Sequence, residues 1–297
     1  MSKIHPDLQR AARLSPRGGI GPRLQPALRW LTDRMSRRTR KGIETIELGN
    51  QVIRLHRPPG ASEPGPALLW IHGGGYVIGT PAQDDPVCKQ LSRDAGIVVA
   101  AVSYRLAPQD PFPAGLDDCF AGLLWLLEQP FVDKARVAVG GASAGGGLAA
   151  AVALRAREHG IALRLQLLVY PMLDDRTCLR TDVDESDFRL WNLRGNNFGW
   201  RSYTGKDPGA ADIPQLAAPA RCEDLQGLAP AWIGVGTCDL FHDEDVEYAV
   251  RLRGAGVPCD LDVVDGAFHG FDSVAPKAPV VRTFNQAKVA ALAAALD

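Results

Sequence analysis

A short apolar run leads directly into a serine flanked by glycines near the middle of the chain. Residues 137–140 are Val-Ala-Val-Gly, and the next five are Gly141-Ala-Ser143-Ala-Gly145. An apolar strand that meets this pattern before a helix predicts a nucleophile elbow, a sharp turn on which the serine hydroxyl projects above a sheet. The residues two positions before and after the serine approach each other, so both must be small. A phosphate-binding loop is the alternative, but the stretch lacks lysine and the GxxxxGK[ST] pattern.

Short apolar runs alternate with helical patterns along most of the chain. We expect strands at residues 43–48, 52–57, 67–71, 97–102, 137–140, 165–170, 231–235 and 261–264. We expect helices at residues 85–95, 114–128, 144–159, 242–255 and 279–295. The first two strands flank Gly49–Asn50 and read as an antiparallel hairpin. The later alternation predicts an α/β fold, a mostly parallel central sheet with helices on both faces.

A second glycine-rich stretch, His72-Gly73-Gly74-Gly75, follows the strand expected at residues 67–71. Glycines let a ligand approach the backbone, and their N–H groups can point at a developing oxyanion. HGGG is an oxyanion motif of lipases and esterases. Gly73 and Gly74, together with Ala144 after the serine, are therefore the expected oxyanion-hole donors.

A serine hydroxyl is a weak nucleophile and needs a base. If the elbow is that of an α/β-hydrolase, in which the triad runs serine, acid, histidine along the chain, the base is a histidine after Ser143. The three downstream histidines are His159, His242 and His269. His159 falls at an expected helix C-terminus, and His242 falls in the first turn of a helix. His269 lies in a loop after the last apolar strand, where this fold places catalytic groups, so it is the expected base.

The acid of the triad should follow the strand expected at residues 231–235, which is the strand before the one that leads to His269. Asp239 lies just after that strand. It would hold His269 in the correct tautomer. Capping the next helix is the alternative role for Asp239. Asp265 is a rival acid, but we expect it to end its own strand.

The first 41 residues are strongly basic. They contain nine Arg and two Lys against two Asp, a net charge of +9, whereas the whole chain carries −1. No secretory apolar core is present. The segment reads as helical pieces lying on an acidic body, with a mitochondrial transit peptide and an anion-binding arm as alternatives.

Other composition features exclude several classes of protein. The longest apolar stretches, residues 148–154 and 289–296, are far shorter than the roughly 18 residues of a membrane span. The six cysteines form neither a CxxC pair nor a zinc pattern with histidine. We expect free thiols, no metal or cofactor, no nucleic-acid or membrane partner, and a cytoplasmic location.

Residues 174–203 interrupt the strand–helix alternation and are rich in aromatic side chains. An insertion at the carboxyl end of a strand in such a fold usually covers the ligand site. An ordinary surface excursion is the alternative. If residues 1–41 also cover the site, Leu28, Trp30 and Leu31 are expected to pack over the mouth of the pocket.

These motifs resemble the hormone-sensitive-lipase-like (bacterial group IV) carboxylesterases of the α/β-hydrolase superfamily, over roughly residues 40–295. The matching stretches are His72–Gly75, Gly141–Gly146, Tyr104–Pro108 with Phe112–Ala114, Tyr170–Asp175 and Asp239–Glu244. Two positions depart from the family pattern. Leu240 replaces the commoner proline, and Ala142 stands where aspartate or threonine is usual.

The resemblance implies a catalytic domain of residues 42–297 and a helical cap built from residues 1–41 and about 174–203. It implies hydrolysis of short- to medium-chain acyl esters through a Ser143, Asp239 and His269 triad and an acyl-enzyme. Alternatives are an amidase or deacetylase acting on a small acylated metabolite, a long-chain lipase, and a non-catalytic small-molecule binding protein. The chain is expected to be a monomer or a homodimer.

Overall fold

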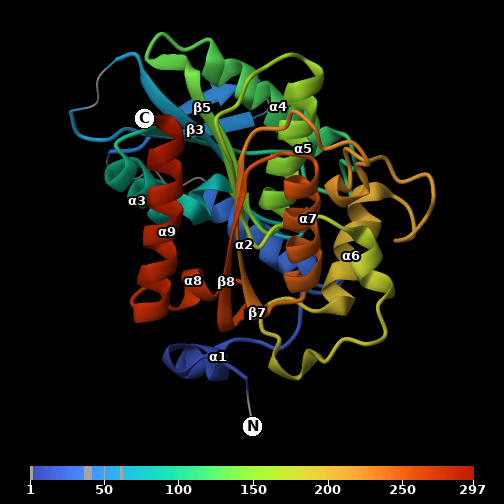
Figure 1. The fold of residues 1–297 in the computed structure, drawn as a ribbon. Helices are drawn as coiled ribbons and strands as arrows, with labels where there is room; N and C mark the ends of the chain where they lie inside the picture. Colours follow the sequence, from blue (N-terminus) through green and yellow to red (C-terminus); the bar gives the residue numbers. More distant parts are fainter. Residues whose placement is uncertain (1–2, 37–41, 50, 61–62) are drawn as a thin grey trace.

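The computed structural model describes residues 3–36, 42–49, 51–60 and 63–297. In this part of the chain, eight strands form one sheet in the order β1-β2-β4-β3-β5-β6-β7-β8 (Figure 1). The pairs β1–β2 and β2–β4 are antiparallel, and all other neighbours are parallel. The strands are β1 (Glu44–Leu48), β2 (Gln51–His56), β3 (Gly65–Ile71), β4 (Val98–Val102), β5 (Val132–Ala142), β6 (Gln166–Val169), β7 (Ala231–Cys238) and β8 (Cys259–Phe268).

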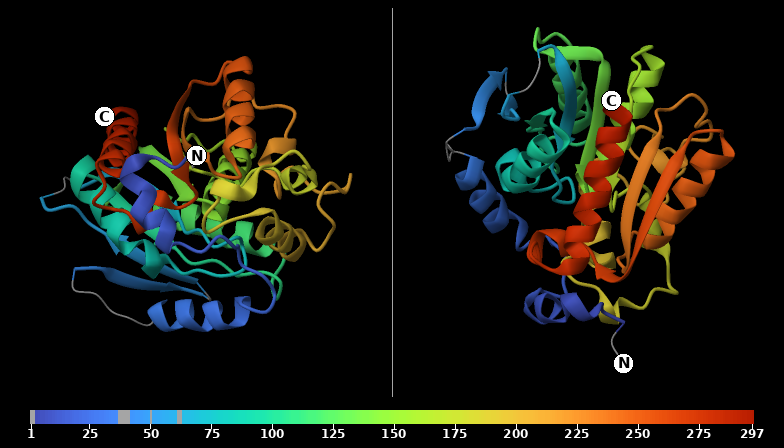
Figure 2. Two further views of the ribbon diagram at one scale, coloured as in Figure 1. Left: turned by 90° about the horizontal axis from the view of Figure 1, so that it is seen from below. Right: turned by 60° about the vertical axis from the view of Figure 1, so that its left-hand side comes forward.

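Helices cover both faces of the sheet (Figures 1 and 2). One face carries α3 (Asp85–Ala95), α8 (Phe271–Val274) and α9 (Pro279–Leu296). The other carries α4 (Ala114–Leu127), α5 (Ala144–Glu158) and α7 (His242–Gly254). Because both faces are covered, the central strands are largely apolar where they are buried; all five residues of β4 are buried. The predicted α/β fold class is confirmed.

Two further segments lie at the carboxyl end of the parallel strands. The N-terminal segment (residues 3–36) contains α1 (Gln9–Leu14) and α2 (Gln25–Ser36). The β6–β7 insertion (residues 170–230) contains α6 (Leu193–Thr204). Hydrogen bonds join them: the N–H of Leu190 donates to the carbonyl of Pro16 at 2.8 Å, and the N–H of Gly19 donates to Asn192 Oδ1 at 3.1 Å.

The predicted strands and helices all occur, with changes at their ends. β5 begins at Val132, five residues before its apolar run, because Val132 already pairs with Gly65 of β3; residues 133–136, charged or partly exposed, fall in a register shift before the ladder resumes at Val137. β8 continues to Phe268 at the edge of the sheet, where only β7 is its partner. An apolar pattern marks only the part of a strand that is buried on both faces.

One expectation about the N-terminal segment is wrong. Leu28 is half-buried, but Trp30 is 64% exposed and Leu31 is 49% exposed. The side of α2 that faces the body instead buries Gln25 and Thr32, and Gln25 Nε2 donates to the carbonyl of Val77. Polar side chains therefore make the close contacts of α2, and Trp30 points into solvent.

Two further properties bear on the expected class of protein. No helix in the described ranges combines the length and apolarity needed to cross a bilayer. All six cysteines are free thiols.

Candidate active site

Ser143 occupies the turn between β5 and α5 in a backbone conformation that side-chain-bearing residues rarely adopt, with φ 57° and ψ −125°. The turn is closed by glycines that touch. A Cβ on Gly141 would overlap the carbonyl of Gly145, and a Cβ on Gly145 would overlap the carbonyl of Ile71. The strained turn therefore requires small residues on both sides, and it lifts the Ser143 side chain out of the helix.

A continuous hydrogen-bonded chain connects Ser143 to an acid. His269 Nε2 lies 2.9 Å from Ser143 Oγ, and His269 Nδ1 lies 2.8 Å from Asp239 Oδ2. The other oxygen of Asp239 accepts from the backbone N–H of Phe241 at 3.0 Å. All three residues of the chain are buried. Because the carboxylate accepts at Nδ1, the proton of a neutral His269 sits there and Nε2 can accept from the serine hydroxyl.

The rival residues lie elsewhere. His159 ends α5 and packs beside the ring of Phe120. His242 contacts Asp243 at the start of α7. Asp265 is exposed and accepts from the hydroxyl of Thr237. The carboxyl ends of β5, β7 and β8 thus bring together the predicted residues Ser143, Asp239 and His269. None of the rival residues contacts them.

Backbone donors border the serine. In the part of the chain that the structure describes, the N–H groups of Gly73 and Gly74 have no acceptor. A Cβ on Gly73 would lie 3.3 Å from Ser143 Cβ, so this loop passes directly beside the elbow. Ala144 is the first residue of α5, where N–H groups have no partner inside the helix. The arrangement can stabilise a negative charge formed next to Ser143.

The glycine loop is held from below by His72 and Tyr104. Their rings stack with centroids 4.3 Å apart, and the Tyr104 hydroxyl donates to the His72 carbonyl at 3.0 Å. Burial lowers the pKa of His72 to about 4, so its imidazole is neutral near pH 7. A neutral ring facing a carbonyl must donate, so His72 Nδ1–H bonds the carbonyl of Gly73, 2.9 Å away.

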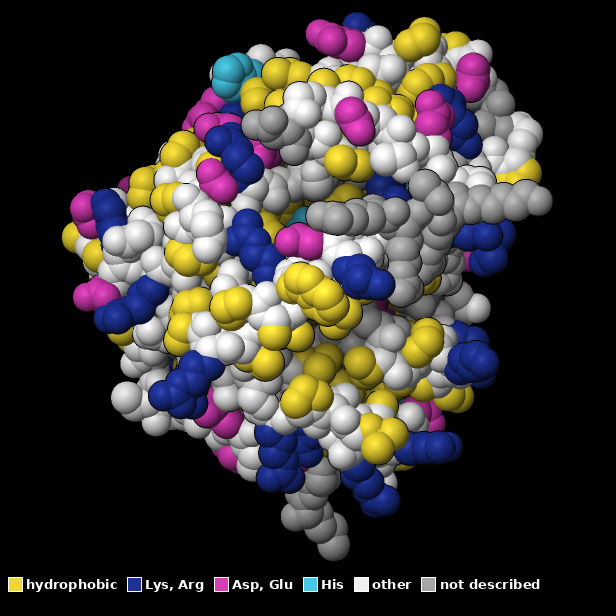
Figure 3. Space-filling view, turned by 180° about the vertical axis from the view of Figure 1, so that it is seen from behind, with side chains coloured by type: hydrophobic (Ala, Val, Ile, Leu, Met, Phe, Trp, Pro, Cys, Tyr) yellow, Lys and Arg dark blue, Asp and Glu magenta, His cyan; other side chains and the backbone are white. Residues whose placement is uncertain are grey.

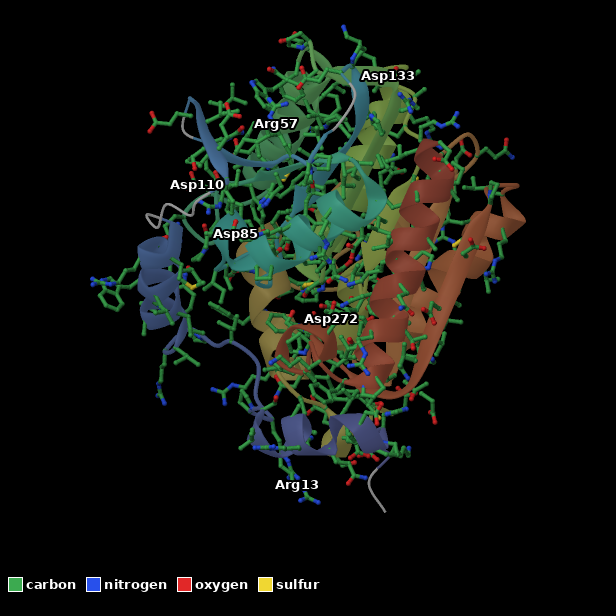
Figure 4. All side chains as sticks on the ribbon, turned by 90° about the vertical axis from the view of Figure 1, so that its left-hand side faces the viewer. Arg13, Arg57, Asp85, Asp110, Asp133 and Asp272 are labelled. Carbon is green, nitrogen blue, oxygen red and sulfur yellow. The ribbon has the colours of Figure 1, made fainter. Side chains whose placement is uncertain are left out.

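Aromatic rings enclose the imidazole of His269. Tyr170 and Phe241 meet it edge-on at centroid distances of 4.8 and 5.2 Å. The Tyr170 hydroxyl donates to Asp272 Oδ1 at 2.6 Å, and the buried Lys288 ammonium lies 2.9 Å from Asp272 Oδ2. Figure 4 shows Asp272 on α8, beside α9. Sequence reasoning missed this support, although Tyr170 stood in a family-like stretch; a lysine in an amphipathic helix gives no signal of burial.

Trp191 of the β6–β7 insertion lies over the glycine loop. A Cβ on Gly75 would overlap the six-membered part of its ring, and its centroid is 6.3 Å from that of His269. The indole Nε1–H donates to Asn196 Oδ1 at 3.2 Å, which fixes the ring orientation. Trp191 therefore restricts the space above the serine. Its place had no sequence signal beyond the aromatic content of the insertion.

Ion pairs tie the loop at Arg105 to α4, and α4 to α5. Arg105 pairs with Asp118 at 2.8 Å, while Asp117 pairs with Arg155 at 2.6 Å. Glu244, in the motif that begins with Asp239, accepts from the N–H groups of Leu173 and Asp174.

No group of three or more potential metal ligands occurs within residues 3–36, 42–49, 51–60 and 63–297.

Comparison with known proteins gives concordant matches. A family model described as alpha/beta hydrolase fold matches residues 68–273, a range that includes Ser143, Asp239 and His269. Ethyl acetate hydrolase of Pseudomonas putida is 38% identical over 227 residues, 74% of this chain and 70% of that protein. Carboxylesterase NlhH of Mycobacterium tuberculosis is 34% identical over 260 residues, 82% of this chain and 78% of that protein. A solved structure of a bacterial heroin esterase aligns with a TM-score of 0.89 at 35% identity, covering 99% of this chain and 98% of that one.

Proposed function

Because the chain belongs to the α/β-hydrolase family, in its hormone-sensitive-lipase-like branch, we propose that it hydrolyses carboxylic esters through Ser143, His269 and Asp239. The observation that carries the proposal is the unbroken hydrogen-bond chain from Ser143 Oγ through His269 to Asp239. Free backbone donors beside the hydroxyl supply the second requirement of acyl transfer, a site for the oxyanion.

The geometry supports the following steps. Ser143 Oγ attacks the ester carbonyl carbon while His269 Nε2 takes its proton. The N–H groups of Gly73, Gly74 and Ala144 hold the oxyanion of the tetrahedral intermediate. The intermediate then collapses: the alcohol leaves with the proton from His269 and an acyl-enzyme remains. Water, deprotonated by His269, releases the carboxylic acid and restores the serine.

The N-terminal segment and the insertion at about residues 174–203 act together as the cap of this site, on a catalytic domain of residues 42–297. The hydrogen bonds between Leu190 and Pro16 and between Gly19 and Asn192 support this division of the chain. The position of Trp191 over Gly75 supports a short pocket, so small esters of short- to medium-chain acids are the proposed substrates.

The reaction is tested with purified protein on p-nitrophenyl acetate and butyrate and on the matching anilides. We expect rapid release of nitrophenol from both esters and at most slow cleavage of the anilides. Faster cleavage of the anilides would establish the amidase alternative. No turnover of either class would contradict a hydrolase. The cytoplasmic location and the oligomeric state remain predictions, checked by cell fractionation and light scattering.

A further inference from the structure

We propose that the outer side of the N-terminal segment docks on an anionic lipid surface. This side, called here the N-terminal face, consists of the outward-facing side chains of α1, α2 and the residues between them. The inference does not depend on the roles of Ser143, Asp239 and His269, because it concerns where the molecule binds and not how it reacts.

The N-terminal face exposes large apolar side chains. Leu14 is 79% exposed, Trp30 64%, Leu24 52% and Leu31 49%. Leu14 and Trp30 are the two most exposed large hydrophobic side chains in the described part of the protein. Tryptophan and leucine on the free side of a basic helix are typical of segments that lie in the interfacial layer of a bilayer.

Four arginines of the same face are unpaired. Arg10, Arg13, Arg17 and Arg23 are exposed and make no ion pair or hydrogen bond with other described side chains or backbone groups. Arg34 lies over the ring of Trp30, with 5.8 Å from its guanidinium carbon to the ring centroid. These guanidinium groups keep their donors free for phosphate, which they bind in a fork geometry.

Arginines outside the N-terminal segment have hydrogen-bonding or ion-pair partners, with one exception. Among the described residues from 54 onward, each arginine except Arg194 is held by a carboxylate or by a backbone carbonyl. Arg194 lies in the first turn of α6, two residues after Asn192, which accepts from Gly19. The free arginines therefore gather on the cap.

The figures place α1 and α2 at the outside of the molecule, where α1 lies along the lower edge and α2 along the left-hand edge of Figure 4. Figure 3 shows hydrophobic and basic side chains alternating over the lower half of the face where α2 lies in front. Figure 4 shows Arg13 projecting from α1 away from the body. On α2, Trp30 and Arg34 are one turn apart, opposite the buried Gln25 and Thr32. On α2, an apolar and a cationic side chain can therefore meet a surface together, and Arg13 of α1 projects from the adjacent edge.

Charge gives the docking a direction. Residues 1–41 carry a net charge of +9, so the remaining residues carry −10. An anionic surface attracts the first part and repels the second, which orients the cap toward the membrane. Binding to nucleic acid would need the arginines but not the four exposed apolar side chains. These apolar side chains therefore favour a lipid surface as the partner. The expectation of no membrane partner rested on the lack of a spanning stretch, and docking at a surface needs none.

Vesicle cosedimentation of the full chain tests the proposal. We expect binding to vesicles of phosphatidylcholine with phosphatidylglycerol, weak binding to phosphatidylcholine alone, and release by salt. Arg13→Gln with Arg23→Gln should weaken binding roughly fivefold for each arginine removed. Trp30→Ala with Leu31→Ala should also weaken binding to the anionic vesicles. Quenching of tryptophan fluorescence by brominated lipid should decrease in Trp30→Phe.

A body variant serves as the matched control. Val250→Ala with Arg93→Gln changes one exposed apolar residue and one exposed arginine outside the N-terminal face and should bind like the wild type. Circular dichroism checks that every variant is folded. Absence of binding to anionic vesicles overturns the proposal. So does an equal loss in the control, or binding to heparin without binding to vesicles.

Discussion

The guanidinium of Arg189 donates a 2.8 Å hydrogen bond to the backbone carbonyl of Ala12, 177 residues away in the sequence. Arg189 is buried, and its other bonds also go to backbone carbonyls. The next residue, Leu190, donates to the carbonyl of Pro16. The N-terminal segment therefore holds the backbone that carries Trp191 over the glycine loop, and loss of that segment should be felt at the active site.

Deletion of residues 1–41 should leave a folded protein that is soluble or nearly so, has lost most of its ester hydrolysis and has a changed acyl preference. The sheet and the three triad candidates lie outside the deletion, but Arg189 loses a buried acceptor and water can enter the site. Kinetics of both forms, with thermal unfolding as the control for folding, measure the effect. Undiminished kcat/KM would instead support a transit peptide. Unchanged activity on neutral esters with weaker retention on a polyanion column would support an anion-binding arm.

Short acyl esters should be the best substrates, and Trp191→Ala should move the preference toward longer chains. Removing the indole opens the space above Gly75, which the Trp191 ring fills so closely that even a Cβ on Gly75 would overlap it. The profile of kcat/KM across acetyl to palmitoyl esters checks this. Trp30→Ala, which removes the same side chain from an exposed position, is the control and should keep the wild-type profile. A wild-type rate that rises steadily to the palmitoyl ester would favour the lipase alternative.

Asp239→Asn should preserve the fold but lower kcat by about 10³–10⁴, because the amide places the His269 proton on the wrong nitrogen. The fold should survive because an asparagine oxygen can still accept from the Phe241 N–H. Asp265→Asn, at the exposed rival, should cost far less. Steady-state kinetics on one ester compares the two variants, and the reverse order would place the acid at Asp265.

His56→Gln should make stability less dependent on pH in mild acid. Burial lowers the pKa of His56 from 6.5 to about 4, so the unfolded chain binds this proton more tightly than the folded one. Its contribution to stability is complete above about pH 6.5 and declines as the pH falls toward 4. Urea unfolding at about pH 7 and pH 4.5 should show a loss ~1–3 kcal/mol smaller in the variant. His159→Gln is the control; an identical decline in wild type and His56→Gln would contradict the account.

The parts of the site predicted from sequence are those that depend on local chemistry. The elbow around Ser143 and the loop at Gly73 need glycine at fixed spacings, and these spacings can be read directly from the sequence. The place of Trp191 was not visible, because it depends on a bond between Leu190 and Pro16, far apart in the sequence. Trp30 was misplaced because an apolar residue on a helix was assumed to have a covering partner.

Buried polar groups were equally hidden. Lys288 is 1% exposed and reaches Asp272 across two helices, yet the helical pattern treats a lysine as a surface residue. Only the packed structure shows that this ion pair supports Tyr170 and, through its ring, His269.

The assignment of Ser143 as the nucleophile is the central claim, and covalent labelling tests it most directly. A serine-directed phosphonate ester should inactivate the wild type with one label per chain, recovered on the peptide that contains Ser143. Ser143→Ala should take no label and lose several orders of magnitude in kcat, because the covalent path is removed. Stoichiometric labelling on another peptide, with activity retained in Ser143→Ala, would contradict the account.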